Sequence, residues 1–148
     1  MNPVPVPTIP ALAILGPTAS GKSALALWLA DLGFPIEIIS LDSALVFRDM
    51  DIGTAKLAKA ERRGIPHHLF DIITPAQEMT AVEYQRIARD KCLEIIAAGK
   101  IPMFVGGSMF YLAAAIDNLD FAPTDALIRS ELEQLGQEIG ALAMHAKL

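Results

Sequence analysis

The residues best suited to chemistry in this chain are Gly16-Pro17-Thr18-Ala19-Ser20-Gly21-Lys22-Ser23 and Asp42. The octapeptide matches the pattern Gly-x-x-x-x-Gly-Lys-Ser/Thr at every position. Glycines let such a loop curl so that several backbone N–H groups converge on one point, and the positive end of a following helix adds to the attraction for an anion. The pattern therefore predicts a binding loop for a phosphate or a diphosphate.

Two side chains at the end of this loop can act on the ligand directly. Lys22 is expected to reach the terminal phosphates as a point charge, and the Ser23 hydroxyl is placed to bind a Mg²⁺ that bridges phosphate oxygens. The alternative is a chance glycine-rich turn. The flanking segments argue against it, because an apolar run over residues 11–15 predicts a strand before the loop and residues 23–30 predict a helix after it. We therefore expect Mg²⁺ as a cofactor.

Asp42 follows residues 36–40, a β-branched apolar run that predicts a second buried strand. Ligands of open α/β sheets bind beyond the carboxyl ends of the strands, so Asp42 is expected to face the phosphate loop. Such a carboxylate suits the metal-assisting aspartate of a nucleotide hydrolase or small-molecule kinase, or equally a general base for an incoming nucleophile. The spacing leaves both roles open.

The rest of the chain supplies elements that position these residues. A third strand over residues 101–105 ends in Gly106-Gly107-Ser108 before a helix towards residue 116, so a second glycine turn is expected at the same edge of the sheet. Thr80 and Glu83 form a capping box for a helix that ends at Gly99. Asp125 caps a last helix with apolar positions at Leu127, Ile128, Leu132, Leu135 and Ile139.

These elements predict an α/β fold, a phosphate-loop NTPase-like parallel sheet flanked by helices, over residues 11–148, after an extended leader over residues 1–10. Residues 46–79 show no sustained periodicity and predict a long functional loop with short elements. Their basic cluster can instead be a solvated helix face; its members are Lys56, Lys59, Arg62 and Arg63.

Composition excludes several classes of protein. No apolar stretch of the 148 residues approaches the length of a membrane span, and the start lacks a basic signal region, so we expect a soluble cytosolic protein without membrane partners. The net charge of −5 argues against a generic nucleic-acid coat protein. The single cysteine, Cys92, is expected in the core. Because His67 and His68 are adjacent, they point to different sides and are not expected to bind a metal together.

Five collinear motifs carry a resemblance to a known family. They are Gly-Pro-Thr-Ala-Ser-Gly-Lys-Ser at 16–23, Asp-Ser-Ala-Leu at 42–45, Met-Asp-Ile-Gly-Thr-Ala-Lys at 50–56, Pro-His-His-Leu at 66–69 and Ile-Pro-Met-Phe-Val-Gly-Gly-Ser at 101–108. In this order and over nearly all of the chain, the sequence resembles the tRNA dimethylallyltransferases. Asp49 stands where that family usually has Gly, and Asp tolerates a left-handed backbone better than most residues.

The resemblance implies transfer of a dimethylallyl group from dimethylallyl diphosphate to the N6 amine of the adenosine 3′ of the tRNA anticodon. Residues 16–23 would then hold the donor, with Lys22 and Ser23 in catalysis and Ser23 on the metal. Asp42 would be the general base, and the contacts to tRNA would come from Asp42, Ser43, Ala44, Leu45, Ser108 and Arg129. Family members continue well beyond residue 148, so the resemblance implies an N-terminal part that is poorly active alone and a monomer at full length. A kinase or hydrolase that consumes ATP or GTP, and a remnant that only binds, remain the alternatives.

Overall fold

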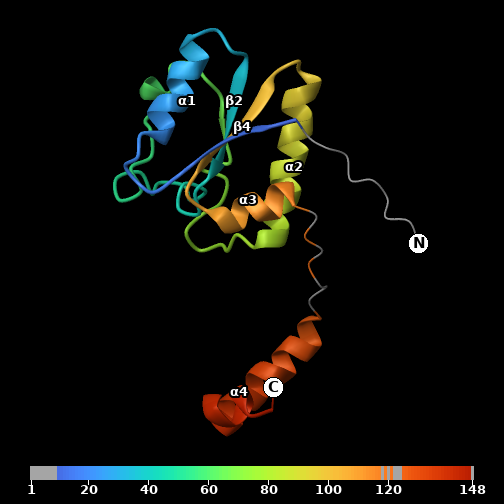
Figure 1. Cartoon of the computed structure of the whole chain (residues 1–148). Helices are drawn as coiled ribbons and strands as arrows, with labels where there is room; N and C mark the ends of the chain where they lie inside the picture. Colours follow the sequence, from blue (N-terminus) through green and yellow to red (C-terminus); the bar gives the residue numbers. More distant parts are fainter. Residues whose placement is uncertain (1–9, 118, 120, 122–124, 148) are drawn as a thin grey trace, which may run out of the picture.

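A computed structural model of the chain describes residues 10–117, 119, 121 and 125–147 (Figure 1). Its elements are β1 (Leu12–Leu15), α1 (Lys22–Asp31), β2 (Ile36–Leu41), the 3₁₀ helix η1 (Lys59–Arg62), β3 (His67–His68), α2 (Ala81–Ala97), β4 (Ile101–Gly106), α3 (Met109–Ile116) and α4 (Ala126–His145). The strands and helices expected from the sequence are present at their predicted places. The leader expected over residues 1–10 lies outside the described residues except for Pro10.

The four strands form one parallel sheet in the order β1-β4-β2-β3. In the central pair, Ile36 lies opposite Ile101 and Leu41 opposite Gly106. Each change of strand runs through a crossover, and α1 and α2 supply two of these crossovers. The expected α/β fold is confirmed, and the parallel order brings the ends of β1, β2 and β4 to one edge.

Helices cover both faces of the sheet (Figure 1). Ala26 of α1 packs on one face with Ile36, Ile38, Met103 and Val105. Residues of α2 and α3 pack on the other face with Ile39, Leu41 and Phe104. Strand β2 is buried along its whole length, which explains its apolar residues, and its two polar residues, Glu37 and Ser40, are buried with them.

The segment between β2 and α2 is the long loop region that the sequence predicts. It contains η1, the two-residue strand β3 and an isolated parallel bridge between Phe47 and Ile73. Several of its residues other than glycine have a left-handed backbone, and Asp49 is one of them with a φ of 62°. The expectation that Asp takes a left-handed conformation at this position is confirmed.

The capping signals are confirmed at both predicted helices. The Thr80 hydroxyl accepts a hydrogen bond from the Glu83 N–H, and Asp125 accepts from the N–H groups of Leu127 and Ile128. Helix α4 carries the expected apolar positions but has no buried residue, and its backbone breaks at Gly140. Among the helices that the structure describes, none combines the length and apolarity needed to cross a membrane.

Candidate phosphate and acceptor site

The phosphate loop joins β1 to α1 in the conformation that an anion site requires. Ala19 and Gly21 have left-handed backbones, with φ of 63° and 84°. Gly21 is the N-cap of α1 and no side chain caps this helix, so the first N–H groups of α1 have no side-chain acceptor. A left-handed residue within such a turn aims successive N–H groups into one concavity. The loop therefore offers backbone donors and the positive end of α1 to a phosphate.

Lys22 lies across this loop. Its ammonium donates a hydrogen bond of 2.6 Å to the carbonyl oxygen of Pro17. An ammonium group has three N–H donors, so this bond leaves two for a ligand in the loop. The bond holds the ammonium against the backbone of the loop at Pro17.

Asp42 follows directly after the last residue of β2, and short-range hydrogen bonds fix its position. Its Oδ1 accepts a 2.8 Å hydrogen bond from the N–H of Ala44, and its own N–H donates to Oγ of Ser40 over 3.2 Å. The other carboxylate oxygen, Oδ2, has no hydrogen-bond partner among the described residues. The carboxylate is thus held through one of its two oxygens.

Tyr84 of α2 is buried and contacts the end of β2. Its hydroxyl donates a 2.9 Å hydrogen bond to the carbonyl of Ser40, and its ring stacks on Tyr111 with the centroids 4.0 Å apart. Burial raises the pKa of both phenols, so both stay protonated. The sequence shows Tyr84 only as an apolar position of a helix, and nothing in its spacing indicates the hydrogen bond to β2.

The second glycine turn packs tightly against the end of β2. A Cβ on Gly106 would lie 2.6 Å from the backbone carbonyl carbon of Leu41, and a Cβ on Gly107 would lie 3.3 Å from the carbonyl oxygen of Gly16. The N–H of Ser108 donates to the Leu41 carbonyl over 3.0 Å, and its hydroxyl caps α3 by accepting from Tyr111. The approach of β4 to the end of β2 therefore requires glycine at position 106, whereas a Cβ on Gly107 would make a tight contact.

A cleft of about 430 Å³ opens where the three strand ends meet. Its walls contain the start of the phosphate loop, the end of β2 and the second glycine turn; the lining residues are Gly16, Pro17, Thr18, Leu41, Asp42, Ser43, Gly107, Ser108 and Met109. The sequence-based expectations that the two turns face one site and that Asp42 faces the phosphate loop are confirmed. Leu41 and Met109 were not expected in this site.

The remaining predicted site residues lie outside this cleft. Ser23 and Leu45 line a second, mostly apolar cavity of about 40 Å³ on the α1 side of the sheet. In the sequence, Ala44 stands between Ser43, which lines the cleft, and Leu45. Arg129 lies on α4, where its guanidinium pairs with Glu133 of the same helix over 2.9 Å. That pair raises the Arg129 pKa. The structure does not bring Arg129 to the cleft, and its role stays a prediction.

The basic cluster of the long loop is divided in the structure. Lys59 and Arg63 are exposed, as a solvated helix face requires, and Arg63 pairs with Asp31. Lys56 is buried instead and forms ion pairs with Asp51 and Asp71. Neither sequence-based interpretation, a functional basic patch or a solvated face, anticipates this buried lysine.

His67 and His68 point to different sides of β3, as expected for neighbours on a strand. Nδ1 of His67 contacts the carbonyl of Ile65, whereas Nε2 of His68 contacts the carboxylate of Glu37. Burial lowers the His67 pKa. Among the described residues, no group of three or more His, Cys, Asp or Glu side chains is arranged to hold a metal ion.

Comparison with known proteins decides the family. A family model described as IPP transferase matches residues 45–148. This chain belongs to the IPP transferase family. A relative named tRNA dimethylallyltransferase from Thermobifida fusca is 50% identical over 141 residues, which cover 93% of this chain and 44% of the relative. A relative of the same name from Leptothrix cholodnii is 48% identical over 99% of this chain and 47% of its own length.

Solved structures of IPP transferases support the same family assignment. The tRNA isopentenylpyrophosphate transferase from Bacillus halodurans has a TM-score of 0.72 and 40% identity over 94% of this chain and 46% of its own chain. A eukaryotic dimethylallyltransferase described as acting on tRNA has a TM-score of 0.70 and 28% identity over 87% of this chain. This IPP transferase chain therefore spans about half the length of the relatives that it matches.

Proposed function

We propose that this chain carries the donor site and the catalytic base of a tRNA dimethylallyltransferase. The observation that supports this function best is the shared cleft, in which the phosphate loop, Asp42 and Ser108 line one space. A phosphate loop alone is equally consistent with a nucleotide kinase or hydrolase. Membership of the IPP transferase family favours prenyl transfer over nucleotide turnover.

The donor in this proposal is dimethylallyl diphosphate. Its diphosphate would lie against the N–H groups of residues 16–23, with Lys22 on the terminal oxygens. Negative charge builds up on the diphosphate as it leaves. Fixed N–H donors and an ammonium placed at that point stabilise the charge without reorganisation, which lowers the barrier.

The acceptor is the N6 amine of the adenosine 3′ of the anticodon. An enzyme cannot reach such an amine within a stacked loop, so the adenine would be flipped out into the cleft. Asp42, Ser43 and Ser108 line the cleft and would contact the tRNA there, and Ala44 and Leu45 would contact it from outside the cleft. Arg129 would contact it from α4.

The transfer is a substitution at C1 of the dimethylallyl group. The N6 lone pair forms the new N–C bond, the C1–O bond breaks, and its electron pair leaves with the diphosphate. The N6 proton goes to Oδ2 of Asp42, the carboxylate oxygen without a hydrogen-bond partner among the described residues. A base is needed because the amine lone pair is delocalised into the adenine ring, which makes it a weak nucleophile.

The Mg²⁺ of this proposal would be held at the start of α1 by Ser23, which lies outside the residues that line the cleft. Magnesium binds through one or two protein oxygens together with phosphates and water, and does not need a cage of protein ligands. The hydroxyl of Ser23 is exposed in the first turn of α1 and would supply such an oxygen. When bound, the ion would neutralise charge on the diphosphate.

The test is an assay of prenyl transfer by the protein at its full natural length, with unmodified tRNA, Mg²⁺ and labelled dimethylallyl diphosphate. We expect label in the tRNA and release of diphosphate, and no consumption of ATP or GTP in parallel reactions. Nucleotide hydrolysis or phosphoryl transfer without label in the tRNA would replace this function by the kinase or hydrolase. Absence of both activities would leave a protein that only binds.

A further inference from the structure

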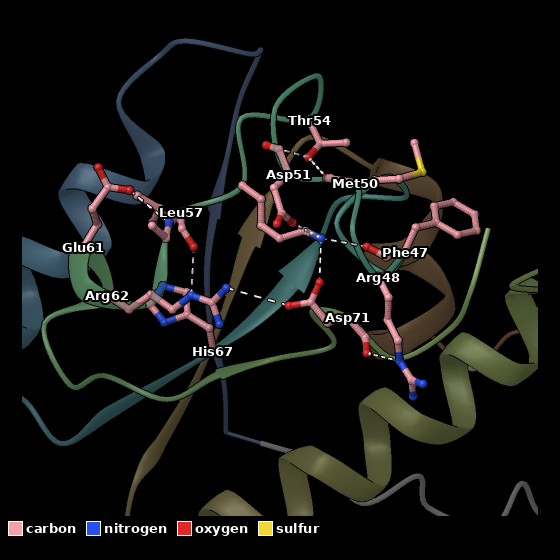
Figure 2. A network of polar contacts seen from close by, with 12 residues as sticks. Phe47, Arg48, Met50, Asp51, Thr54, Leu57, Glu61, Arg62, His67 and Asp71 are labelled. Atoms are coloured by element: carbon pink, nitrogen blue, oxygen red, sulfur yellow. Dashed lines mark hydrogen bonds and ion pairs between the residues drawn. The ribbon is translucent and has the colours of Figure 1, made fainter.

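Lys56 lies in the long loop region that follows residues 42–45, and each of the three N–H donors of its ammonium has an acceptor. Its ammonium donates to the carbonyl of Phe47 over 2.7 Å, to Asp71 over 2.6 Å, and pairs with Asp51 over 2.9 Å. Figure 2 shows Phe47, Asp51 and Asp71 gathered around one point from three parts of the long loop. We call this arrangement the Lys56 clasp.

The clasp consists of a buried ammonium and two carboxylates that remain partly exposed. The Lys56 side chain is 2% exposed. Burial by itself lowers the pKa of this ammonium, but the hydrogen bonds and ion pairs with Asp71 and Asp51 raise it above its ordinary value. Because its three N–H groups already have acceptors, Lys56 has no donor left for a substrate.

Asp71 connects the clasp to the chain that follows the catalytic segment. Its N–H donates to the carbonyl of Leu45 over 3.1 Å, and its carbonyl accepts from Nε of Arg48 over 2.9 Å. The N–H of Ile72 donates to Val46 over 2.9 Å. Residues 45–48 are therefore bonded along residues 71–73, and Lys56 joins the two segments through Phe47 and Asp71.

This arrangement holds residues 42–45 at both ends. At the front end, which directly follows β2, the N–H of Asp42 donates a hydrogen bond to Oγ of Ser40. The back end is Leu45, bonded to Asp71, and the fully buried Val46. The four-residue turn between them has two further bonds, from the N–H of Ala44 to the Asp42 carboxylate and from the N–H of Phe47 to the carbonyl of Ala44 over 3.3 Å. Loss of the Lys56 contacts would remove the link between Phe47 and Asp71 and would leave only the backbone bonds at the back end.

We propose that Lys56 is a positioning residue for the acceptor, which acts by fixing the turn of residues 42–45 through Phe47 and Asp71. The proposal rests on the proposed function in one respect, since the acceptor is the tRNA adenosine assigned above. It separates two halves of one site: the donor half depends on α1 and its loop, and the acceptor half depends on the clasp.

The structural test compares Lys56→Met with Lys100→Met by amide hydrogen exchange. Lys100 offers a control, because it is also a lysine that pairs with a carboxylate, that of Glu37, but in a different part of the structure. We expect exchange of residues 43–48 to rise about tenfold or more in Lys56→Met, the equivalent of one lost charged hydrogen bond, and to stay at the parental level in Lys100→Met. Unchanged exchange at residues 43–48 would overturn the proposal.

The kinetic test uses the same variants at a temperature where each is fully folded. For Lys56→Met we expect the tRNA KM or the single-turnover rate to worsen about tenfold while diphosphate affinity stays within about twofold of the parent. Should Lys56→Met not fold, Asp71→Asn keeps the size of the side chain and removes its charge, and we expect the same split at smaller amplitude. Equal loss of donor and acceptor binding would overturn the proposal.

The two tests keep this inference separate from the proposed function. A parent protein that fails to prenylate tRNA contradicts the proposed function, and the exchange measurement still tests the clasp. A parent that prenylates normally, with a Lys56→Met variant of parental kinetics, contradicts the positioning role alone.

Discussion

The N–H of Ser108 donates a 3.0 Å hydrogen bond to the carbonyl of Leu41, the residue directly before Asp42. This bond ties the second glycine turn to the end of β2. It exists because Gly106 lets the two chains approach to a distance that a side chain would prevent. The position of Asp42 therefore depends on a glycine more than sixty positions later in the sequence, and this dependence leads to the first prediction.

We expect Gly106→Ala to destabilise the protein. A Cβ would lie 2.6–2.7 Å from the backbone and side chain of Leu41, so β2 and β4 must separate locally. Overpacking of this kind costs about 1–3 kcal/mol of the free energy of unfolding. Urea titration measures the change. Gly53→Ala is the control, since a Cβ there would meet no atom within 4 Å, and parental stability of Gly106→Ala would contradict the packing.

Cys92 is expected to resist alkylation in the folded protein. The thiol is 1% exposed, and burial raises its pKa to about 11, so little thiolate is present at pH 8. Labelling with iodoacetamide should be slow in buffer and fast in concentrated urea. Rapid labelling of the native protein would mean that α2 does not pack on the sheet as described.

The pH dependence of stability should include a contribution from Glu37. Burial alone raises the pKa of this carboxyl, but hydrogen bonds and ion pairs with Lys100 and His68 lower it below its ordinary value of 4.5. A lowered folded pKa gives stability that is present above pH 4.5 and is lost as the pH falls through the folded pKa.

The matching variant is Glu37→Gln, which cannot titrate. We expect it to lose about 1–3 kcal/mol at pH 7, because Lys100 loses its charged partner and the amide offers one acceptor oxygen where the carboxylate offers two. Below pH 4.5 its free energy of unfolding should depend less steeply on pH than that of the parent. Parallel curves for the two proteins across that range would contradict the lowered pKa.

The sequence predicts the parts of this site that local rules determine. The glycine spacing of residues 16–23, the apolar run before Asp42 and the caps at Thr80 and Asp125 each depend on neighbours a few positions away. The parallel sheet then brings Asp42 and Ser108 together by a general rule of topology. These features are all found where they were expected.

The Lys56 clasp could not be predicted in the same way. Lys56 and Asp71 are 15 positions apart in a segment without periodicity. Their meeting depends on left-handed backbones at Ala55 and Asp71, and alanine is not a residue type that indicates such a conformation. In sequence, Lys56 is one of four basic residues, and burial alone distinguishes it. Likewise, the helical pattern predicts that the ring of Tyr84 is buried, but it does not predict the hydrogen bond from its hydroxyl to β2.

Lys22→Ala should weaken diphosphate binding and leave the fold intact. The ammonium bonds only the Pro17 carbonyl among the described residues, and it is not part of the core. Loss of one charged contact to phosphate corresponds to about 10–100-fold in affinity. Titration calorimetry with diphosphate and Mg²⁺ measures it, with the exposed Lys59→Ala as control. Unchanged affinity would show that the loop does not hold the diphosphate.

The last prediction concerns Asp42→Asn. The amide keeps Oδ1 as the acceptor for the Ala44 N–H, so the turn should keep its shape. What is lost is the ability to take the proton from N6 as the new bond forms. Prenyl transfer should therefore fall by roughly 10²–10⁴-fold, the usual loss for a general base. Single-turnover rates with saturating tRNA measure this, and diphosphate affinity measured beside them should stay at the parental value.

Donor affinity distinguishes the two roles that the sequence leaves open for Asp42. A general base acts on the acceptor, so its loss lowers the rate and leaves the Mg²⁺-dependent binding of diphosphate intact. A metal-assisting aspartate acts through the ion, so its loss weakens that binding and the rate together. The cleft favours the first role, because Asp42 lines it with Ser43 and Ser108, whereas Ser23 lines the other cavity. A variant with the parental rate and affinity would remove Asp42 from the reaction altogether.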